Sequence, residues 1–191
     1  MDHEEWLRAI RAALRGLVGE PDDERRGRLA ELLRETPESV AELGDDALRR
    51  ARRHGGWEAV SLHDDAASNM SVFALPAGLE MPLHDHPGMT VLCVVLRGRA
   101  VVHSLDWAED YPWSGLARSH GEQHVSVDGR CLMLDSGSHN IHGIRAIEDF
   151  VFVDLLAPRY DEAGGRACHY YHELGRLEMN GEVFVRLRPV S

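Results

Sequence analysis

The sequence predicts a mainly β domain, a sandwich or barrel, preceded by a helical segment that packs on it. Three observations predict this fold class. Apolar side chains recur at helical spacing in residues 1–56, whereas residues 57–191 break into short apolar runs separated by turn residues. The length of 191 residues suffices for one well-buried core but is short for two full domains. We therefore expect a helical segment over residues 1–56 and a barrel over residues 57–191 in a single structural unit.

Three helices are expected in the first segment. The apolar stripe of EEWLRAIRAALRGL comprises Trp6, Ile10, Ala13, Leu14 and Leu17, and DDERRGRLAELLRE repeats this pattern. A third helix is predicted to begin with Thr36 as its N-cap and Pro37 at its first helical position. The arginines of LRRARRHGG suit a helix C-terminus that Gly55 and Gly56 end, and we prefer this interpretation to a phosphate-binding patch.

The β part begins after Gly56, and its clearest strands are MSVFAL, TVLCVVL, RAVVHSL, HVSV, CLML, FVFVDLL and VFVRLR. Near the end of the chain, Asn180-Gly181 stands between two extended runs, which is the strongest short-range signal of a β-hairpin. The stretch from Trp107 to Glu122 has no clear period and contains Tyr111, Pro112 and Trp113. We predict that it is a long loop, which forms the mouth of the barrel together with the hairpin.

Composition excludes several classes of protein. A formal net charge of -11 argues against a general nucleic-acid binder, which would need a basic face. All 21 basic residues are arginine, so a lysine Schiff base and a lysine-bearing phosphate loop are excluded. Three widely spaced cysteines are typical of free thiols in a reducing cytosol. The acidic N-terminus, and the lack of an apolar stretch near the ~18 residues of a membrane span, predict a cytoplasmic protein without membrane contact.

The two histidines of PLHDHPG are candidate metal ligands. On an extended strand side chains alternate, so His84 and His86 point to one face and Asp85 to the other. Two imidazoles on one face can bind one ion, although exposed histidines in a turn are the simpler interpretation. A third ligand must come from another strand. His142 precedes an apolar strand much as the pair does, and His139 ranks second.

Three blocks of the chain match one family in order and spacing: PLHDHPGMTVLCVVLRGRAVVHSLDW, NIHGIRAI and DLLAPRYDEAGGRACHYY. Over residues 70–172 the sequence resembles the thiol dioxygenase family of cysteamine dioxygenase and the plant cysteine oxidases. The resemblance implies a cupin β-barrel (double-stranded β-helix) that holds a mononuclear non-haem Fe(II) ion. Carried over by position, it implies His84, His86 and His142 as metal ligands. It also implies Asp154 and Tyr160 as catalytic residues at the cavity, with Tyr160 as a hydrogen-bond donor.

This implied ligand set contains no carboxylate. Cupin metal sites commonly add a glutamate shortly after the second histidine, where this chain has Thr90 and Val91. Three neutral imidazoles leave a ferrous ion with its full double positive charge, which favours an anionic, soft ligand such as a thiolate. A thiolate and O2 held side by side would make oxidation of the sulfur intramolecular, and the expected product is a sulfinic acid.

Asp154 lies in FVFVDLLAPRY, a run that is otherwise suited to burial. A buried carboxylate needs a partner, and two interpretations stay open. Asp154 forms an ion pair with an arginine such as Arg145 or Arg159, or it faces the iron cavity and receives the ammonium of a substrate or an iron-bound water.

The cysteines divide into two groups. Cys93 and Cys131 are best explained as inert core residues. Cys168 and Tyr170 are two residues apart and would share a face of a strand, so a redox-sensitive role or a thioether crosslink between them is a second option for Cys168.

The leading hypothesis is an iron-dependent dioxygenase for a 2-aminoethanethiol-type thiol, either cysteamine or the N-terminal cysteine of a peptide or protein. The negative charge of the protein favours these cationic thiols over free cysteine. We expect a monomer whose partners are the thiol and O2, without nucleic acid or membrane. Two alternatives remain: a non-catalytic metal- or thiol-sensing cupin, and a cupin that uses zinc or manganese for hydrolysis or isomerisation.

Overall fold

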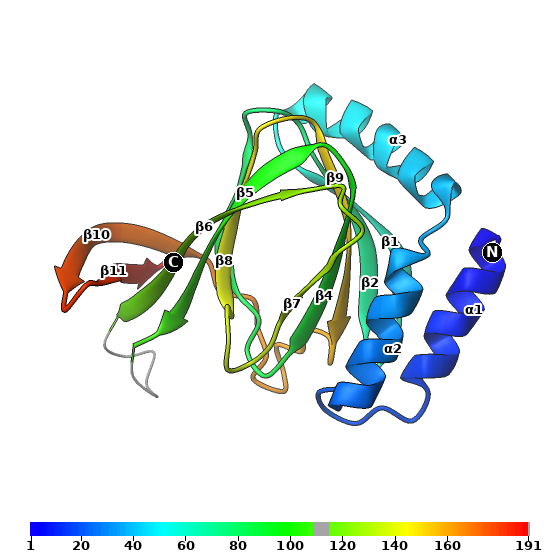
Figure 1. Cartoon of the computed structure of the whole chain (residues 1–191), viewed down its shortest axis with the longest axis horizontal. Helices are drawn as coiled ribbons and strands as arrows, with labels where there is room; N and C mark the ends of the chain where they lie inside the picture. Colours follow the sequence, from blue (N-terminus) through cyan, green and yellow to red (C-terminus); the bar gives the residue numbers. More distant parts are fainter. Residues whose placement is uncertain (109–114, 191) are drawn as a thin grey trace.

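Three helices lie outside two antiparallel β-sheets in the computed structural model, which describes residues 1–108 and 115–190 (Figure 1). The helices are α1 (His3–Leu14), α2 (Asp23–Arg34) and α3 (Glu38–His54). Gly55 ends α3 with φ +71°, as predicted from its position.

Thr36 is not the N-cap of α3, so that prediction was wrong. Its hydroxyl donates to the carbonyl of Leu33, because the last turn of α2 also has carbonyls to satisfy, and Pro37 takes the N-cap position instead.

The strands form a five-stranded sheet, β1-β2-β9-β4-β7, and a six-stranded sheet, β10-β11-β6-β5-β8-β3. Their bounds are β1 (Glu58–Asp64), β2 (Asn69–Leu75), β3 (Glu80–Asp85), β4 (Thr90–Arg97), β5 (Arg99–Trp107), β6 (Leu116–Ser126), β7 (Cys131–Leu134), β8 (Ile141–Ala146), β9 (Phe150–Ala157), β10 (Tyr171–Met179) and β11 (Glu182–Pro189). The two sheets face each other as a barrel (Figure 1), which confirms the predicted mainly β fold.

The helical segment covers the outer face of the five-stranded sheet (Figure 1). Helix α3 approaches so closely that a Cβ atom added at Gly44 would overlap Cγ1 of Val151 in β9. Because helices cover one face of this sheet and the barrel interior the other, every residue of β9 is buried, including Asp154. No helix in the described part of the chain is both long and apolar enough to cross a membrane.

Glu20, between α1 and α2, ties the helical segment to one end of the barrel. Its carboxylate accepts hydrogen bonds from the Thr90 hydroxyl at 3.0 Å and from the Ser136 hydroxyl at 2.6 Å. Thr90 begins β4, and Ser136 lies in the turn that leads toward β8. Strands β4 and β8 both reach the candidate functional site. These hydrogen bonds therefore hold the helical segment against two elements that support the site.

The stretch from Trp107 to Glu122 differs from its prediction. β5 extends to Trp107 and β6 begins at Leu116, so the loop prediction is wrong for residues 116–122, while Tyr111, Pro112 and Trp113 lie outside the described residues. The polar first half of β6 is extended because it pairs with β5 and, at Arg118, with Phe184 of β11. The hairpin is confirmed, with Asn180 and Gly181 at positive φ, and it projects away from the barrel (Figure 1).

Candidate metal centre

Three buried histidines meet at one end of the barrel interior. His84 lies in β3, His86 directly follows that strand, and His142 lies opposite His84 on β8. One ring nitrogen from each histidine lies within 4.8 Å of the others, and each residue is at most 7% exposed. The structure therefore brings together the three residues that the resemblance implied as ligands.

Asn140 holds the histidine that lies outside a strand. Its side-chain oxygen accepts from the backbone N–H of His86 at 3.2 Å, and its Nδ2 donates to the His86 carbonyl at 2.7 Å. Nδ2 also donates to the carbonyl of Asp135 at 3.1 Å. Asn140 thus pairs with His86 as a neighbouring strand would. Sequence reasoning missed this residue, although it stands two positions before His142 in the block NIHGIRAI.

Electrostatics keep these imidazoles neutral. Burial lowers the pKa of His84 below its usual range and lowers those of His86 and His142 much further, with a contribution to both from the neighbouring rings. Neutral imidazole is the form that binds a metal ion. Nε2 of His86 is buried and, within the described residues, has no hydrogen-bond partner, which is costly unless a ligand occupies it. The site thus fits a divalent ion held by nitrogen donors alone.

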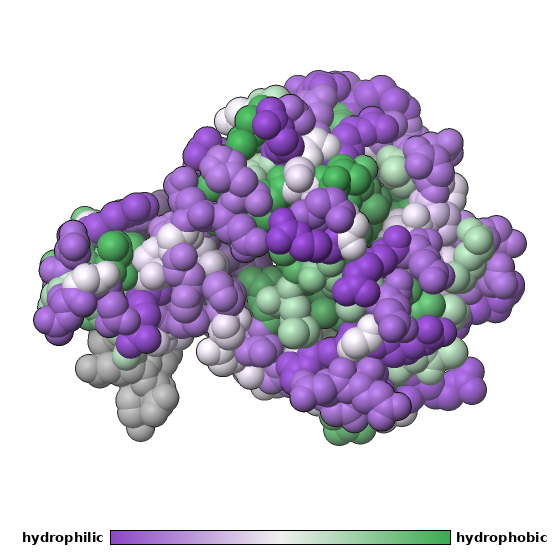
Figure 2. Space-filling model, in the orientation of Figure 1, coloured by the Kyte–Doolittle hydropathy of each residue, from purple (hydrophilic) through white to green (hydrophobic). Residues whose placement is uncertain are grey.

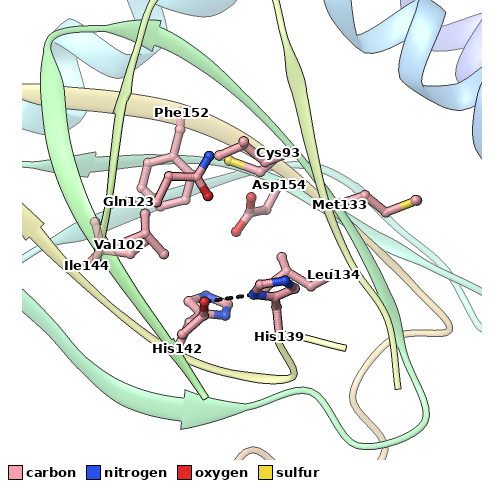
Figure 3. Close-up of a pocket in the computed structure, with 12 residues that line it drawn as sticks. Cys93, Val102, Gln123, Met133, Leu134, His139, His142, Ile144, Phe152 and Asp154 are labelled. Atoms are coloured by element: carbon pink, nitrogen blue, oxygen red, sulfur yellow. Dashed lines mark hydrogen bonds between the residues drawn. The ribbon is translucent and has the colours of Figure 1, made fainter. Parts of the chain in front are cut away.

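A cavity of about 110 Å³ adjoins His142 (Figure 3). It is lined by Cys93, Val102, Ser104, Gln123, Leu132, Met133, Leu134, His139, His142, Ile144, Phe152 and Asp154. Figure 2 shows hydrophobic residues at the hollow over the barrel, surrounded by hydrophilic surface. None of the described residues of the hairpin or of 107–122 lines this cavity, and their predicted place at its mouth stays a prediction. β10 and β11 extend the six-stranded sheet outward, beyond β6.

His139, the second-ranked ligand candidate, lies on the cavity wall outside the converging set. Its Nδ1 is 2.8 Å from the hydroxyl of Ser104, as the dashed line in Figure 3 marks. His139 adopts φ +59° in the turn before β8, which places its ring differently from that of His142.

Asp154 faces this cavity from β9 (Figure 3). Neither predicted arginine pairs with it: Arg145 lies 3.9 Å from Glu80, and Arg159 donates to Asp64 at 2.9 Å. One carboxylate oxygen, Oδ1, is buried without a hydrogen-bond partner in the described part of the chain. Burial raises the pKa of Asp154 to about 7, and the neighbouring thiol of Cys93 partly opposes this rise.

The family model described as PCO_ADO matches residues 33–185, which is most of the chain. The chain belongs to this family. The PCO_ADO family comprises cysteamine dioxygenases and plant cysteine oxidases, and the two-sheet barrel with its three helices is the cupin double-stranded β-helix that the resemblance implied.

Several members of the PCO_ADO family are similar to this chain. It is 30% identical over 139 residues to human 2-aminoethanethiol dioxygenase, with 59% of this chain and 51% of that protein covered. It is 31% identical over 128 residues to plant cysteine oxidase 1 of Arabidopsis thaliana, with 63% and 43% covered. A probable 2-aminoethanethiol dioxygenase of Dictyostelium discoideum is 35% identical over 125 residues, with 63% and 56% covered. The chain spans about half the length of these relatives.

Solved structures resemble the barrel more distantly. A Klebsiella pneumoniae protein with a double-stranded β-helix domain has a TM-score of 0.48 at 20% identity, with 66% of this chain and 87% of that one covered. A cupin superfamily protein from Desulfitobacterium hafniense has a TM-score of 0.40 at 17% identity, with 54% and 78% covered.

In this PCO_ADO member, Tyr160 lies behind His86, and its implied position at the cavity stays a prediction. Its hydroxyl donates to the carbonyl of Asp85 at 2.7 Å and lies 2.7 Å from Nδ1 of His86. Because the Tyr160 hydroxyl donates its proton to the Asp85 carbonyl, it can only accept from His86. His86 therefore carries its proton on Nδ1, which leaves the lone pair of Nε2 free to bind a metal ion. His84 is arranged alike, because its Nδ1 lies 2.9 Å from the Pro82 carbonyl.

Cys168 and Tyr170 precede β10, so the argument from a shared strand face does not apply. Their side chains still lie close together, and that of Tyr160 is also near the Cys168 thiol. Burial raises the pKa of Cys168, which keeps it a thiol. The thioether crosslink stays a prediction.

Asp85 anchors the segment that carries these residues, a role that sequence reasoning missed. As predicted from the alternation of side chains, it points away from the histidine pair. Its buried carboxylate accepts from the Tyr171 hydroxyl at 2.7 Å and from the backbone N–H of His169 at 2.8 Å. The side chains of HDH therefore serve two purposes, since two face the candidate metal centre and one holds the neighbouring segment in place.

Proposed function

We propose that this PCO_ADO member is an Fe(II)-dependent dioxygenase that oxidises a 2-aminoethanethiol-type thiol, either cysteamine or the N-terminal cysteine of a peptide or protein. The observation that carries the proposal is a cluster of three buried neutral imidazoles, one of which, His142, lines the same cavity as the buried carboxyl group of Asp154. The reaction is RSH + O2 → RSO2H. The S–H and O–O bonds break, two S–O bonds and one O–H bond form, and the sulfur supplies all four electrons that O2 takes up, so no other reductant is needed.

The chain's own residues would hold the ion and the substrate. Nε2 of His84, Nε2 of His86 and a ring nitrogen of His142 would bind Fe(II), with Tyr160 and Asn140 holding His86 in place. When bound by three neutral ligands, the ferrous ion keeps its full charge and supplies a site that favours a thiolate and reacts with O2. His84, His86 and His142 are buried, so they also exclude water from the side of the ion that they cover.

Asp154 supports a substrate that carries an ammonium group near its thiol. An ionised carboxylate in a poorly hydrated cavity attracts a cation strongly, and Oδ1 has no protein partner in the described residues. No arginine is among the described residues that line the cavity, so the carboxylate of free cysteine would lack a partner. The volume of about 110 Å³ compares with the roughly 10–15 Å³ that one water needs, and it suits a small thiol or a chain terminus.

The test is oxygen consumption by the full chain, purified without oxygen and loaded with Fe(II). Cysteamine and a Cys-Gly peptide are expected to consume O2 and to gain the mass of two oxygen atoms, whereas free cysteine reacts poorly. Metal binding without turnover would support a sensor instead. Hydrolytic or isomerase activity that survives replacement of iron by zinc would support the other alternative. Monomeric state and cytoplasmic location stay predictions from the sequence.

A further inference from the structure

Cys93 and Asp154 form a cross-strand pair at the cavity wall. They are register partners in the antiparallel pairing of β4 with β9, so their side chains leave the same face of the sheet. Directly opposite residues in such a pair have Cβ atoms roughly 4.5–5.5 Å apart. Both side chains line the cavity, and Figure 3 shows the thiol beside the carboxyl group.

Two polar neighbours of Asp154 use their hydrogen-bonding groups elsewhere. On the other side of β9 the register partner of Asp154 is Ser71, whose hydroxyl donates to Asn69 at 3.2 Å. His139, which also lines the cavity, uses its Nδ1 with Ser104. The Cys93 thiol lies beside the carboxyl group of Asp154 (Figure 3), and Oδ1 of that carboxyl group has no hydrogen-bond partner within the described residues. Cys93 and Asp154 are each 8% exposed, so water would compete little with a hydrogen bond between them.

We propose that Cys93 is a positioning residue for Asp154: its S–H donates to one carboxylate oxygen and keeps the other turned into the cavity, where it receives the substrate's ammonium. The binding of the substrate's ammonium by Asp154 rests on the proposed function, whereas the hydrogen bond from the Cys93 thiol to Asp154 does not. A fixed carboxylate binds a cation with less loss of side-chain freedom than a rotating one.

The chemistry of the thiol agrees with a donor role. Burial and the nearby charge of Asp154 raise the pKa of Cys93 well above the usual range of a thiol, so the group keeps its proton. A protonated thiol is a poor nucleophile and a poor metal ligand. Cys93 can therefore stand at the wall of a thiol-oxidising cavity without competing with the substrate.

The direct test is the S–H stretching band of the full chain in infrared spectra, a region where few other protein groups absorb. The difference between the wild type and Cys93→Ser assigns the band of Cys93. It is expected at lower frequency than the bands of unbonded thiols and to move upward in Asp154→Leu. Cys131→Ser serves as the control, because Cys131 packs toward the helices and does not line the cavity. A Cys93 band at the unbonded position, or one that Asp154→Leu leaves in place, would overturn the proposal.

The second test compares cysteamine with 2-mercaptoethanol, which carries a hydroxyl in place of the ammonium. Cys93→Ala is expected to raise KM for cysteamine about five- to tenfold and to leave KM for 2-mercaptoethanol unchanged. Cys93→Ser, which restores an O–H donor, is expected to return KM for cysteamine to within about twofold of the wild type. An equal effect of Cys93→Ala on both thiols would contradict positioning. If the wild type oxidises neither thiol, the proposed function fails while the infrared result still decides the S–H bond.

Discussion

The hydroxyl of Tyr160 lies 2.7 Å from Nδ1 of His86, although the two residues are 74 positions apart in the chain. This contact sets the tautomer of His86 and turns Nε2 toward the other two histidines. Tyr160→Phe keeps the aromatic ring and removes only the hydroxyl. We expect the affinity for Fe(II) to fall by roughly 10- to 100-fold, which is typical when a ligand loses its outer hydrogen bond. Competition with a chelator under anaerobic conditions measures this, and an unchanged affinity would show that His86 is oriented by other contacts.

His142 and His139 offer a matched pair of variants, three residues apart and both on the cavity wall. His142→Ala is expected to abolish stoichiometric binding of Fe(II), because two ligands from one segment cannot surround the ion. His139→Ala is expected to bind Fe(II) like the wild type, since its ring contacts Ser104 outside the converging set. Metal content after anaerobic loading and gel filtration gives the answer. Loss of iron from both variants would mean that His139 belongs to the site.

Asp154→Asn tests the role of the charge in the cavity. The variant is expected to retain Fe(II) and to lose on the order of 100-fold in kcat/KM for cysteamine, because a buried cation would lose its partner. The loss for 2-mercaptoethanol should be much smaller, since that thiol carries no ammonium. Steady-state oxygen uptake with both thiols measures the ratio. Equal losses would assign Asp154 to the reaction itself and not to recognition of the amine.

Gly44 tests how the helical segment is seated on the barrel. A Cβ atom there would overlap Val151, so Gly44→Ala is expected to lower the free energy of unfolding by about 1–3 kcal/mol. Gly27 is the matched control, because it is exposed in α2 and a Cβ atom added there would meet no described neighbour within 4 Å. Gly27→Ala is expected to stabilise the protein by roughly 0.5–1 kcal/mol through helix propensity. Urea unfolding of both variants distinguishes tight packing of α3 on β9 from a general sensitivity of the helices to replacement of glycine by alanine.

The parts that sequence reasoning predicted are those with local signals. Apolar runs such as TVLCVVL and FVFVDLL became β4 and β9, and the Asn180-Gly181 hairpin formed as expected. Strands β1 and β8 were absent from the predicted set, because EAVSLHD and IHGIRA mix polar residues and glycine with few apolar ones. They are extended because their neighbours pair with them.

The candidate site also has features that local sequence predicts and features that depend on how distant segments fold together. The spacing of His84 and His86 follows from strand geometry and was readable in one short stretch. The contact of Tyr160 with His86 depends on how distant segments fold together. The pairing of Cys93 with Asp154 depends on the register between β4 and β9, which a single sequence does not reveal.

The raised pKa of Asp154 predicts how stability depends on pH. The carboxyl group has a pKa of about 7 when folded and roughly 3.9 when the chain is unfolded. Between these values the folded protein holds a proton that the unfolded chain has released. The stabilising contribution of this proton is therefore complete at low pH and is lost as the pH rises through about 7.

Asp154→Asn mimics the protonated carboxyl group at every pH, so its unfolding free energy relative to the wild type should increase from pH 5 to pH 8, by an amount on the order of a few kcal/mol. Denaturant unfolding at both pH values measures this difference. The cost to the wild type at pH 8 reflects an ionised carboxylate without a partner, and a bound ammonium should offset it. Cysteamine is therefore expected to stabilise the wild type more at pH 8 than at pH 5, and to have little effect on Asp154→Asn. Equal stabilisation of both proteins by cysteamine would show that its amine does not reach Asp154.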